Sequence, residues 1–240
     1  MLAGLLAGLC AIAFAKLVAE PQIAKAERFE RIVDTQAGKA PEKPLVTRDV
    51  QDTAGLGVGV AFAGMAFGGL FGLAFAGVYG RMGQARARTT AAGLATAAFV
   101  ALFVVPFLKY PANPPSVGRP DTIGRRTALY FLAMAVGILA VALAATLERR
   151  LAVRFGTWDA RLVAVLVLVA VVAVAYLVMP GIDEVPAGFP ASVLWRFRLA
   201  SAGTELALWT VLGLSFGWLT ERAEDRGRHP RKRQVAPAPS

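Results

Sequence analysis

Residues 162–182 read LVAVLVLVAVVAVAYLVMPGI, a run of 21 residues without a charged side chain. A helix needs about 20 apolar residues to cross the hydrocarbon core of a bilayer. Lipid offers no hydrogen bonds, so a spanning segment must satisfy its own backbone groups, as a helix does. Residues 54–80, 89–108 and 127–147 also lack Lys, Arg, Asp and Glu and are long enough. These four stretches predict membrane-spanning helices and decide the fold.

Two more apolar windows carry one charge each. They are residues 2–19, which include Lys16 near the end, and residues 199–219, which include Glu205. The alternating pattern of a membrane barrel strand is absent from the sequence. We therefore predict an all-α protein, a polytopic transmembrane helix bundle over residues 1–219 with six membrane-spanning helices.

The first of these windows also has one feature of a signal peptide. Ala13-Phe14-Ala15 resembles a signal-peptidase site. However, no basic residue precedes the apolar run, as one would in a signal peptide. We expect a retained helix, and cleavage would leave five spans.

The composition supports a membrane protein and excludes several functions. The chain has 56% hydrophobic and 18% charged residues and a mean hydropathy of +0.55, whereas soluble domains carry about 25% charged residues. Its single cysteine (Cys10) and single histidine (His229) exclude an internal disulfide, a Cys/His zinc cluster and a Ser-His-Asp triad. No phosphate-binding loop motif is present. We expect no enzymatic activity, no permanently bound cofactor and, despite the net charge of +10, no nucleic-acid partner.

The distribution of Lys and Arg between the loops predicts the orientation. One set of segments holds 13 basic residues in 43 positions, at residues 81–88, 148–161 and 220–240. The other set holds 12 in 68 positions, at residues 20–53, 109–126 and 183–198. The denser set is predicted to be cytoplasmic, which places both termini inside and the first loop outside. Residues 220–240 are predicted to be a disordered basic cytoplasmic tail.

The second window has glycine at every fourth position, at Gly64, Gly68 and Gly72. This spacing leaves a flat strip on which another helix can pack closely. Helix packing is the simpler interpretation. The alternative is a broken helix that exposes carbonyl groups to a permeating ion.

Two predicted outer loops contain the residues that could bind or attract a solute. Each follows a helix that we expect proline to stop, at Pro106 and at Pro180. Oxygen-bearing side chains there could attract a divalent cation, and Asp183 and Glu184 have no basic residue after them until Arg196. The predicted ion path consists of Asp183, Glu184, Glu205 and Asn113.

Glu205 is the only acid inside an apolar window. A charged group at the bilayer centre costs about 2.5–3.5 kcal/mol even on the translocon scale, so it should face the bundle interior or water. A purely structural role remains open, in which Glu205 pairs with Arg198 or with Lys16.

The same two loops resemble a known family. VVPFLKYPANPPSVGRPDTIGRRTALYFLA (104–133) and PGIDEVPAGFPASVLWRFRLASAGTELALW (180–209) are similar to the CbtA family, cobalt transporter subunits. The resemblance implies cobalt uptake for cobalamin synthesis across a bacterial inner membrane. It also implies a small partner, CbtB, with one span and a histidine-containing end. The family is generally described with five spans, whereas the windows here predict six.

Two other functions remain open at this stage. One is a non-transporting scaffold that assembles a membrane complex. The other is a transporter of another solute, such as an organic anion attracted by the arginines at 125, 126, 196 and 198. The lipid bilayer and a second copy of the chain are the other partners considered. The sequence leaves the selected metal, the energy source and the oligomeric state undetermined.

Overall fold

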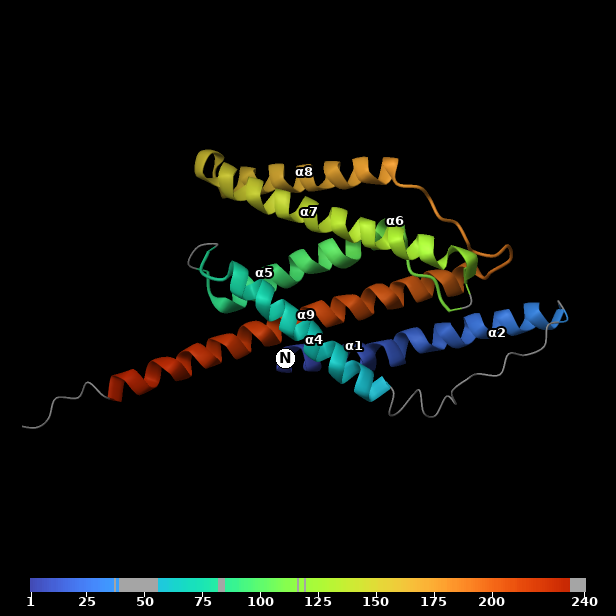
Figure 1. Ribbon diagram of the computed structural model, residues 1–240, viewed down its shortest axis with the longest axis horizontal. Helices are drawn as coiled ribbons and strands as arrows, with labels where there is room; N and C mark the ends of the chain where they lie inside the picture. The colour runs from blue at the N-terminus through green and yellow to red at the C-terminus, as the bar shows by residue number, and fades with distance from the viewer. Residues whose placement is uncertain (37, 39–55, 82–84, 116, 119, 234–240) are drawn as a thin grey trace, which may run out of the picture. The chain divides into compact units, whose positions relative to one another are not determined.

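The computed structural model describes residues 1–36, 38, 56–81, 85–115, 117–118 and 120–233, and within these ranges every regular element is a helix (Figure 1). The α-helices are α1 (Leu2–Phe14), α2 (Glu20–Gln36), α4 (Leu56–Val78), α5 (Ala87–Phe99), α6 (Val105–Lys109), α7 (Ile123–Phe155), α8 (Thr157–Val178) and α9 (Ala191–Arg233). Two π turns, η1 (Ala15–Ala19) and η3 (Val100–Val104), and a short 3-10 turn, η4 (Pro120–Thr122), complete the set. The predicted all-α class is confirmed.

Five continuous helices in the described ranges are long and apolar enough to cross a membrane. They are Leu2–Gln36, Ala87–Lys109, Ile123–Phe155, Thr157–Val178 and Ala191–Gly227. A sixth apolar helix, α4, contributes the shorter apolar stretch Phe62–Val78. Each of the six predicted windows therefore falls on a helix.

Both π turns end two residues before a proline, at Pro21 and Pro106. A proline has no N–H and its ring collides with the carbonyl four residues earlier, so the helix must break, kink or widen there. Here it widens, and the N–H of Val105 bonds to the carbonyl of Val100. The expectation that Pro106 stops its helix was wrong. The helix ends at Lys109, because Tyr110, which precedes Pro111, leaves the helical conformation (φ −127°, ψ 75°).

The predicted first loop begins later than expected, because the first helix continues through α2 to Gln36. The reason lies in tertiary packing. Ala26 of α2 is fully buried, and the ring of Phe29 meets that of Phe189 edge-to-face, with centroids 5.2 Å apart. Most of the rest of that loop, residues 37 and 39–53, lies outside the described residues.

The C-terminal tail also differs from the prediction of disorder, because α9 continues to Arg233. Two side chains at the start of the tail make contacts. Glu221 pairs with Arg88 at 2.5 Å, and the guanidinium of Arg222 lies 4.1 Å from the ring centre of Trp218. Residues 234–240 lie outside the described part of the chain.

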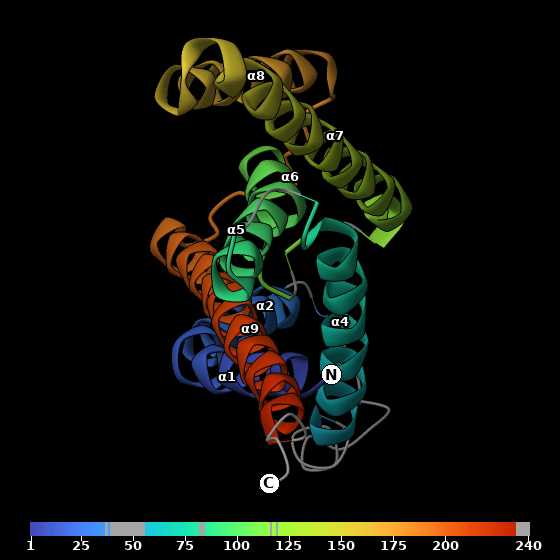
Figure 2. The same ribbon diagram turned by 90° about the vertical axis from the view of Figure 1, so that its left-hand side faces the viewer.

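The chain forms two compact units, and the first comprises Met1–Ala13, Pro44–Thr96 and Leu206–Ser240. Within it α1 crosses α4 at glycines. A Cβ atom on Gly64 would lie 2.8 Å from the carbonyl oxygen of Gly4, and one on Gly68 would lie 3.0 Å from the Gly4 Cα. Gly72, the third predicted packing glycine, instead lies beside the ring of Phe216 on α9. Figure 2 shows the two helices, α4 and α9, that carry these residues. The four-residue spacing thus serves two different neighbours.

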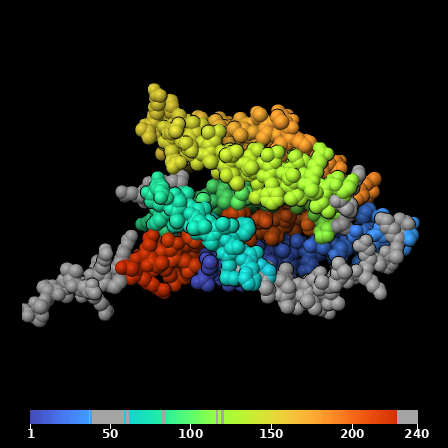
Figure 3. Space-filling model, viewed as in Figure 1, coloured from blue at the N-terminus to red at the C-terminus, as the bar shows by residue number. Residues whose placement is uncertain are grey.

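The second unit comprises Phe14–Lys43 and Ala97–Glu205. Its α7 and α8 form an antiparallel hairpin that turns at Gly156, where φ is +83°. Figure 3 shows atoms of the two helices next to one another. Arg161 and Glu148 pair across the hairpin at 3.0 Å. Gly137 of α7 packs directly against the carbonyl of Ala101 in η3. This unit carries the pocket described next.

Candidate functional site

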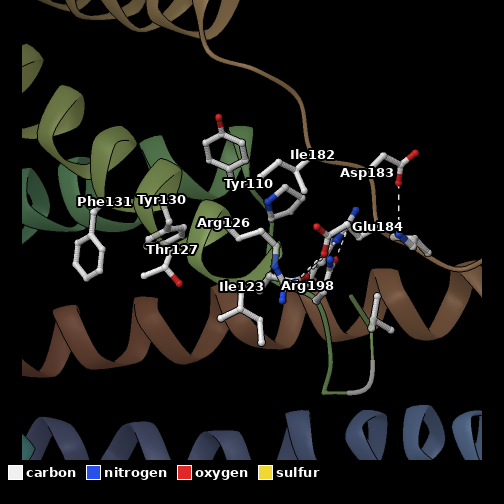
Figure 4. A pocket seen from close by; sticks show the side chains of 15 residues that line it. Tyr110, Ile123, Arg126, Thr127, Tyr130, Phe131, Ile182, Asp183, Glu184 and Arg198 are labelled. Atoms are coloured by element: carbon white, nitrogen blue, oxygen red, sulfur yellow. Dashed lines mark hydrogen bonds and ion pairs between the residues drawn. The ribbon is translucent and has the colours of Figure 1, made fainter. Parts of the chain in front are cut away.

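A pocket of about 360 Å³ opens in the second unit where α6 ends, α7 begins, α8 ends and α9 begins (Figure 4). Its wall mixes charges of both signs with hydroxyl and amide groups. The polar residues on which its chemistry depends are Asn113, Arg126, Tyr130, Asp183, Glu184 and Arg198. Because these helices have membrane-spanning length, a pocket at their ends lies at the edge of the apolar layer.

Three hydrogen bonds fasten the end of α6 to the end of α8 and bring the two loops together. The ammonium of Lys109 donates to the carbonyl of Tyr176 at 2.8 Å, and the hydroxyl of Tyr110 donates to the carbonyl of Pro180 at 2.8 Å. The hydroxyl of Tyr176 donates in return to the carbonyl of Val105. Burial raises the pKa of Tyr110 above its usual value, and the nearby Arg125 charge opposes that rise.

Glu184 and Arg126 form an ion pair in the pocket wall, with Arg126 Nη1 3.2 Å from Glu184 Oε2. The Glu184 side chain is only 6% exposed, and that of Arg126 is 31% exposed. The expectation that these acids have no compensating base nearby was therefore wrong. Arg126 lies at the start of α7 and pairs with Glu184 in the loop between α8 and α9. The two residues are far apart in the sequence, so the sequence did not indicate this pair.

Gly118 allows this pair to form. Its φ of +128° is a conformation that side-chain-bearing residues rarely adopt. A Cβ atom there would collide with the guanidinium of Arg126 and lie 3.1 Å from Glu184 Oε2. The loop between α6 and α7 can therefore lie directly over the ion pair only with glycine at this position.

Arg198 of α9 also binds the loop between α6 and α7. Its Nη2 donates to Asn113 Oδ1 at 3.0 Å, and its Nε donates to the carbonyl of Ala112 at 3.3 Å. The carboxylate of Asp183 interacts electrostatically with Arg198 and accepts a hydrogen bond from the backbone N–H of Val185 at 3.5 Å. The wall of the pocket thus contains two arginines and two carboxylates.

The structure brings together three of the four predicted ion-path residues, Asn113, Asp183 and Glu184, in one pocket. Glu205 is not part of the wall. It lies half-buried on α9 and interacts electrostatically with Tyr130, which does line the pocket. Sequence reasoning missed Tyr130 and Gly118. A tyrosine at the start of an apolar helix and a glycine in a proline-rich loop carry no pattern that distinguishes them.

The described residues contain no group of three or more His, Cys, Asp and Glu side chains placed to hold a metal ion. The side-chain oxygens in the pocket wall belong to two carboxylates, one amide and several hydroxyl groups. Oxygen ligands suit hard divalent cations but discriminate poorly between transition metals. Side-chain oxygens of this kind therefore give no preference for cobalt over other divalent cations.

The apolar helices and the charged pocket at their ends define a multi-pass membrane protein. The chain belongs to the CbtA family, described as "probable cobalt transporter subunit", whose profile matches residues 1–221. The resemblance seen in the two loops is confirmed, and a subunit of a transporter implies at least one partner. No curated protein and no solved structure matches the chain.

Proposed function

We propose that this chain is the large membrane subunit of a bacterial inner-membrane system that takes up cobalt for cobalamin synthesis. The observation that carries the proposal is the family match over residues 1–221. The pocket at the helix ends supports it, because a transport route needs a polar opening at the edge of the apolar layer. Asn113, Asp183 and Glu184 are the groups that meet the cargo there, and Glu205 lies further along α9.

The proposed partner is a small, single-span, histidine-containing subunit of the CbtB type. Imidazole binds transition metals more selectively than carboxylate or carbonyl oxygen. The single histidine of this chain, His229, follows the last apolar window. A partner that supplies imidazole would give the complex a selectivity that this chain's pocket lacks.

The proposed orientation puts the pocket on the outer face of the membrane. Gly38 lies just beyond α2, which packs against the pocket loops and so shares their side. A Gly38→Cys variant in a Cys10→Ser background should react with an impermeant thiol reagent added to intact spheroplasts. Labelling only after lysis would reverse the orientation and place the pocket inside.

Accumulation of radioactive cobalt tests the function. Cells that express this chain together with its partner should accumulate more cobalt than a deletion strain, and cells that express either subunit alone should accumulate less than the pair. Unchanged cobalt accumulation in the deletion strain, together with loss of another membrane complex, would favour the scaffold function instead. Excess nickel and an organic anion are the competitors that would reveal another cargo.

A further inference from the structure

The volume of the pocket and its balance of positive and negative side chains both fit a bare metal ion poorly. A divalent ion that keeps six waters occupies roughly 200 Å³ at about 30 Å³ per water, whereas the pocket measures about 360 Å³. Pockets for small organic molecules start at about 300 Å³. The volume therefore matches an organic molecule, or a metal bound to one.

The charges lead to the same conclusion. Arg126 and Arg198 balance Asp183 and Glu184, so a bare dication entering the pocket meets no excess of negative charge. It would also have to displace Arg126 from the buried carboxylate of Glu184. Guanidinium groups, in contrast, bind carboxylates through two parallel hydrogen bonds and suit a ligand that carries them.

Arg126 and Arg198 both have N–H groups that are not used in hydrogen bonds within the described residues. Arg126 Nε is buried and makes no hydrogen bond within the described residues. Arg198 uses its Nε and one terminal nitrogen on Ala112 and Asn113. The Nε atom is out of reach of a ligand, but the Arg126 side chain is 31% exposed, so the accessible part of its guanidinium can donate to a ligand oxygen in the pocket.

We infer that the pocket binds cobalt as a chelate of a small carboxylate-bearing molecule, with the outer carboxylate oxygens on Arg126 and Arg198. The inference rests on the proposed function and specifies the form of its cargo. The chelator supplies the metal ligands that the pocket lacks, and Asp183 accepts hydrogen bonds from the amine or water ligands of the metal. A polycarboxylate such as citrate and an amino acid such as histidine are two sources of the same chemistry.

Binding to the full-length wild-type protein in lipid nanodiscs tests this directly. Free cobalt is held constant while the concentration of cobalt–citrate, or of cobalt–histidine, is raised stepwise. Bound radioactive cobalt should rise with the chelate in at least one of the two series, and the active series identifies the chelator class. Bound cobalt that follows only the free ion in both series would overturn the inference.

Two arginines on α9 provide a matched pair of variants. Arg198→Gln removes a pocket guanidinium and should raise the half-saturating chelate concentration about tenfold or more, the usual effect of losing a hydrogen bond to a charged group. Arg196→Gln removes an exposed arginine outside the pocket and should leave that concentration unchanged. Arg198→Lys keeps the charge without the fork and should fall between wild type and Arg198→Gln. Equal affinities in the glutamine variants would overturn the inference, and the wild-type titration tests it even if Arg198→Gln fails to fold.

Failure of the inference and failure of the proposed function give different results. If cells that express the full system accumulate no more cobalt than the deletion strain, with or without chelator, the proposed function is wrong. If they accumulate cobalt in proportion to the free ion alone, the function stands and only the chelate inference is wrong.

Discussion

Gly118→Ala should weaken the second unit at the Arg126–Glu184 ion pair. Alanine cannot easily adopt the φ of +128° found at this position, and its methyl group would collide with the Arg126 guanidinium. The same methyl group would lie 3.1 Å from Glu184 Oε2. Either the loop must move away or the ion pair must open, and both changes affect the pocket wall.

The magnitude follows from these two effects. A residue held in such a backbone conformation costs on the order of 1–3 kcal/mol. Breaking a fully buried ion pair costs about 3–5 kcal/mol, but Arg126 is 31% exposed and can partly withdraw into solvent. A total of roughly 2–4 kcal/mol is reasonable, and at about 2–4 °C per kcal/mol for a chain of this size the Tm should fall by roughly 5–15 °C.

Thermal unfolding in detergent, followed by tryptophan fluorescence, measures this change. Gly124→Ala is the matched control, because Gly124 lies in the first turn of α7 with nothing near the position of an added Cβ atom. Alanine favours a helix over glycine by up to about 1 kcal/mol, so the control should melt at or slightly above the wild-type temperature. If Gly118→Ala also melts within a degree of wild type, the argument that glycine is required above the ion pair is wrong.

Three further predictions concern other parts of the chain. Gly68→Leu should destabilise the contact between α1 and α4 by about 1–3 kcal/mol because the helices have no room for a side chain. The control variant Gly69→Leu, at a position that faces open space, should preserve both abundance and Tm. Similar Tm values for the two variants would exclude the close packing. The raised pKa of Tyr110 means that the fold favours the neutral phenol, so its stabilisation is complete below pH of about 10 and is lost as the pH rises through the raised pKa. The wild-type Tm should therefore fall more steeply than that of Tyr110→Phe in this alkaline range, and parallel curves would contradict the assignment. Glu205→Gln should reduce cobalt uptake at normal protein abundance if Glu205 belongs to the transport route; normal uptake would end that role, and lost abundance would favour packing.

The sequence and the structure agree best where the forces are local. Residues 162–182 read as a helix because an apolar run of that length in lipid must bond its own backbone, which requires no knowledge of neighbours. Pro106 shows the limit of this reasoning. Proline predicts a break, but a π turn satisfies the backbone by widening the helix. The carbonyl of Ala101 in this turn then contacts Gly137, and that of Val105 just after the turn accepts a hydrogen bond from Tyr176.

The sequence by itself determined that this is a polytopic helical membrane protein, and its two loop motifs were sufficient to indicate its family. The tertiary structure alone decided the character of the pocket. Whether Asp183 and Glu184 attract a cation depends on which basic groups face them. Arg126 reaches Glu184 because α7 and α8 pack as a hairpin, and the loop between α6 and α7 passes over the pair at Gly118. Apolar length is a property of one segment, whereas charge compensation is a property of segments brought together by packing.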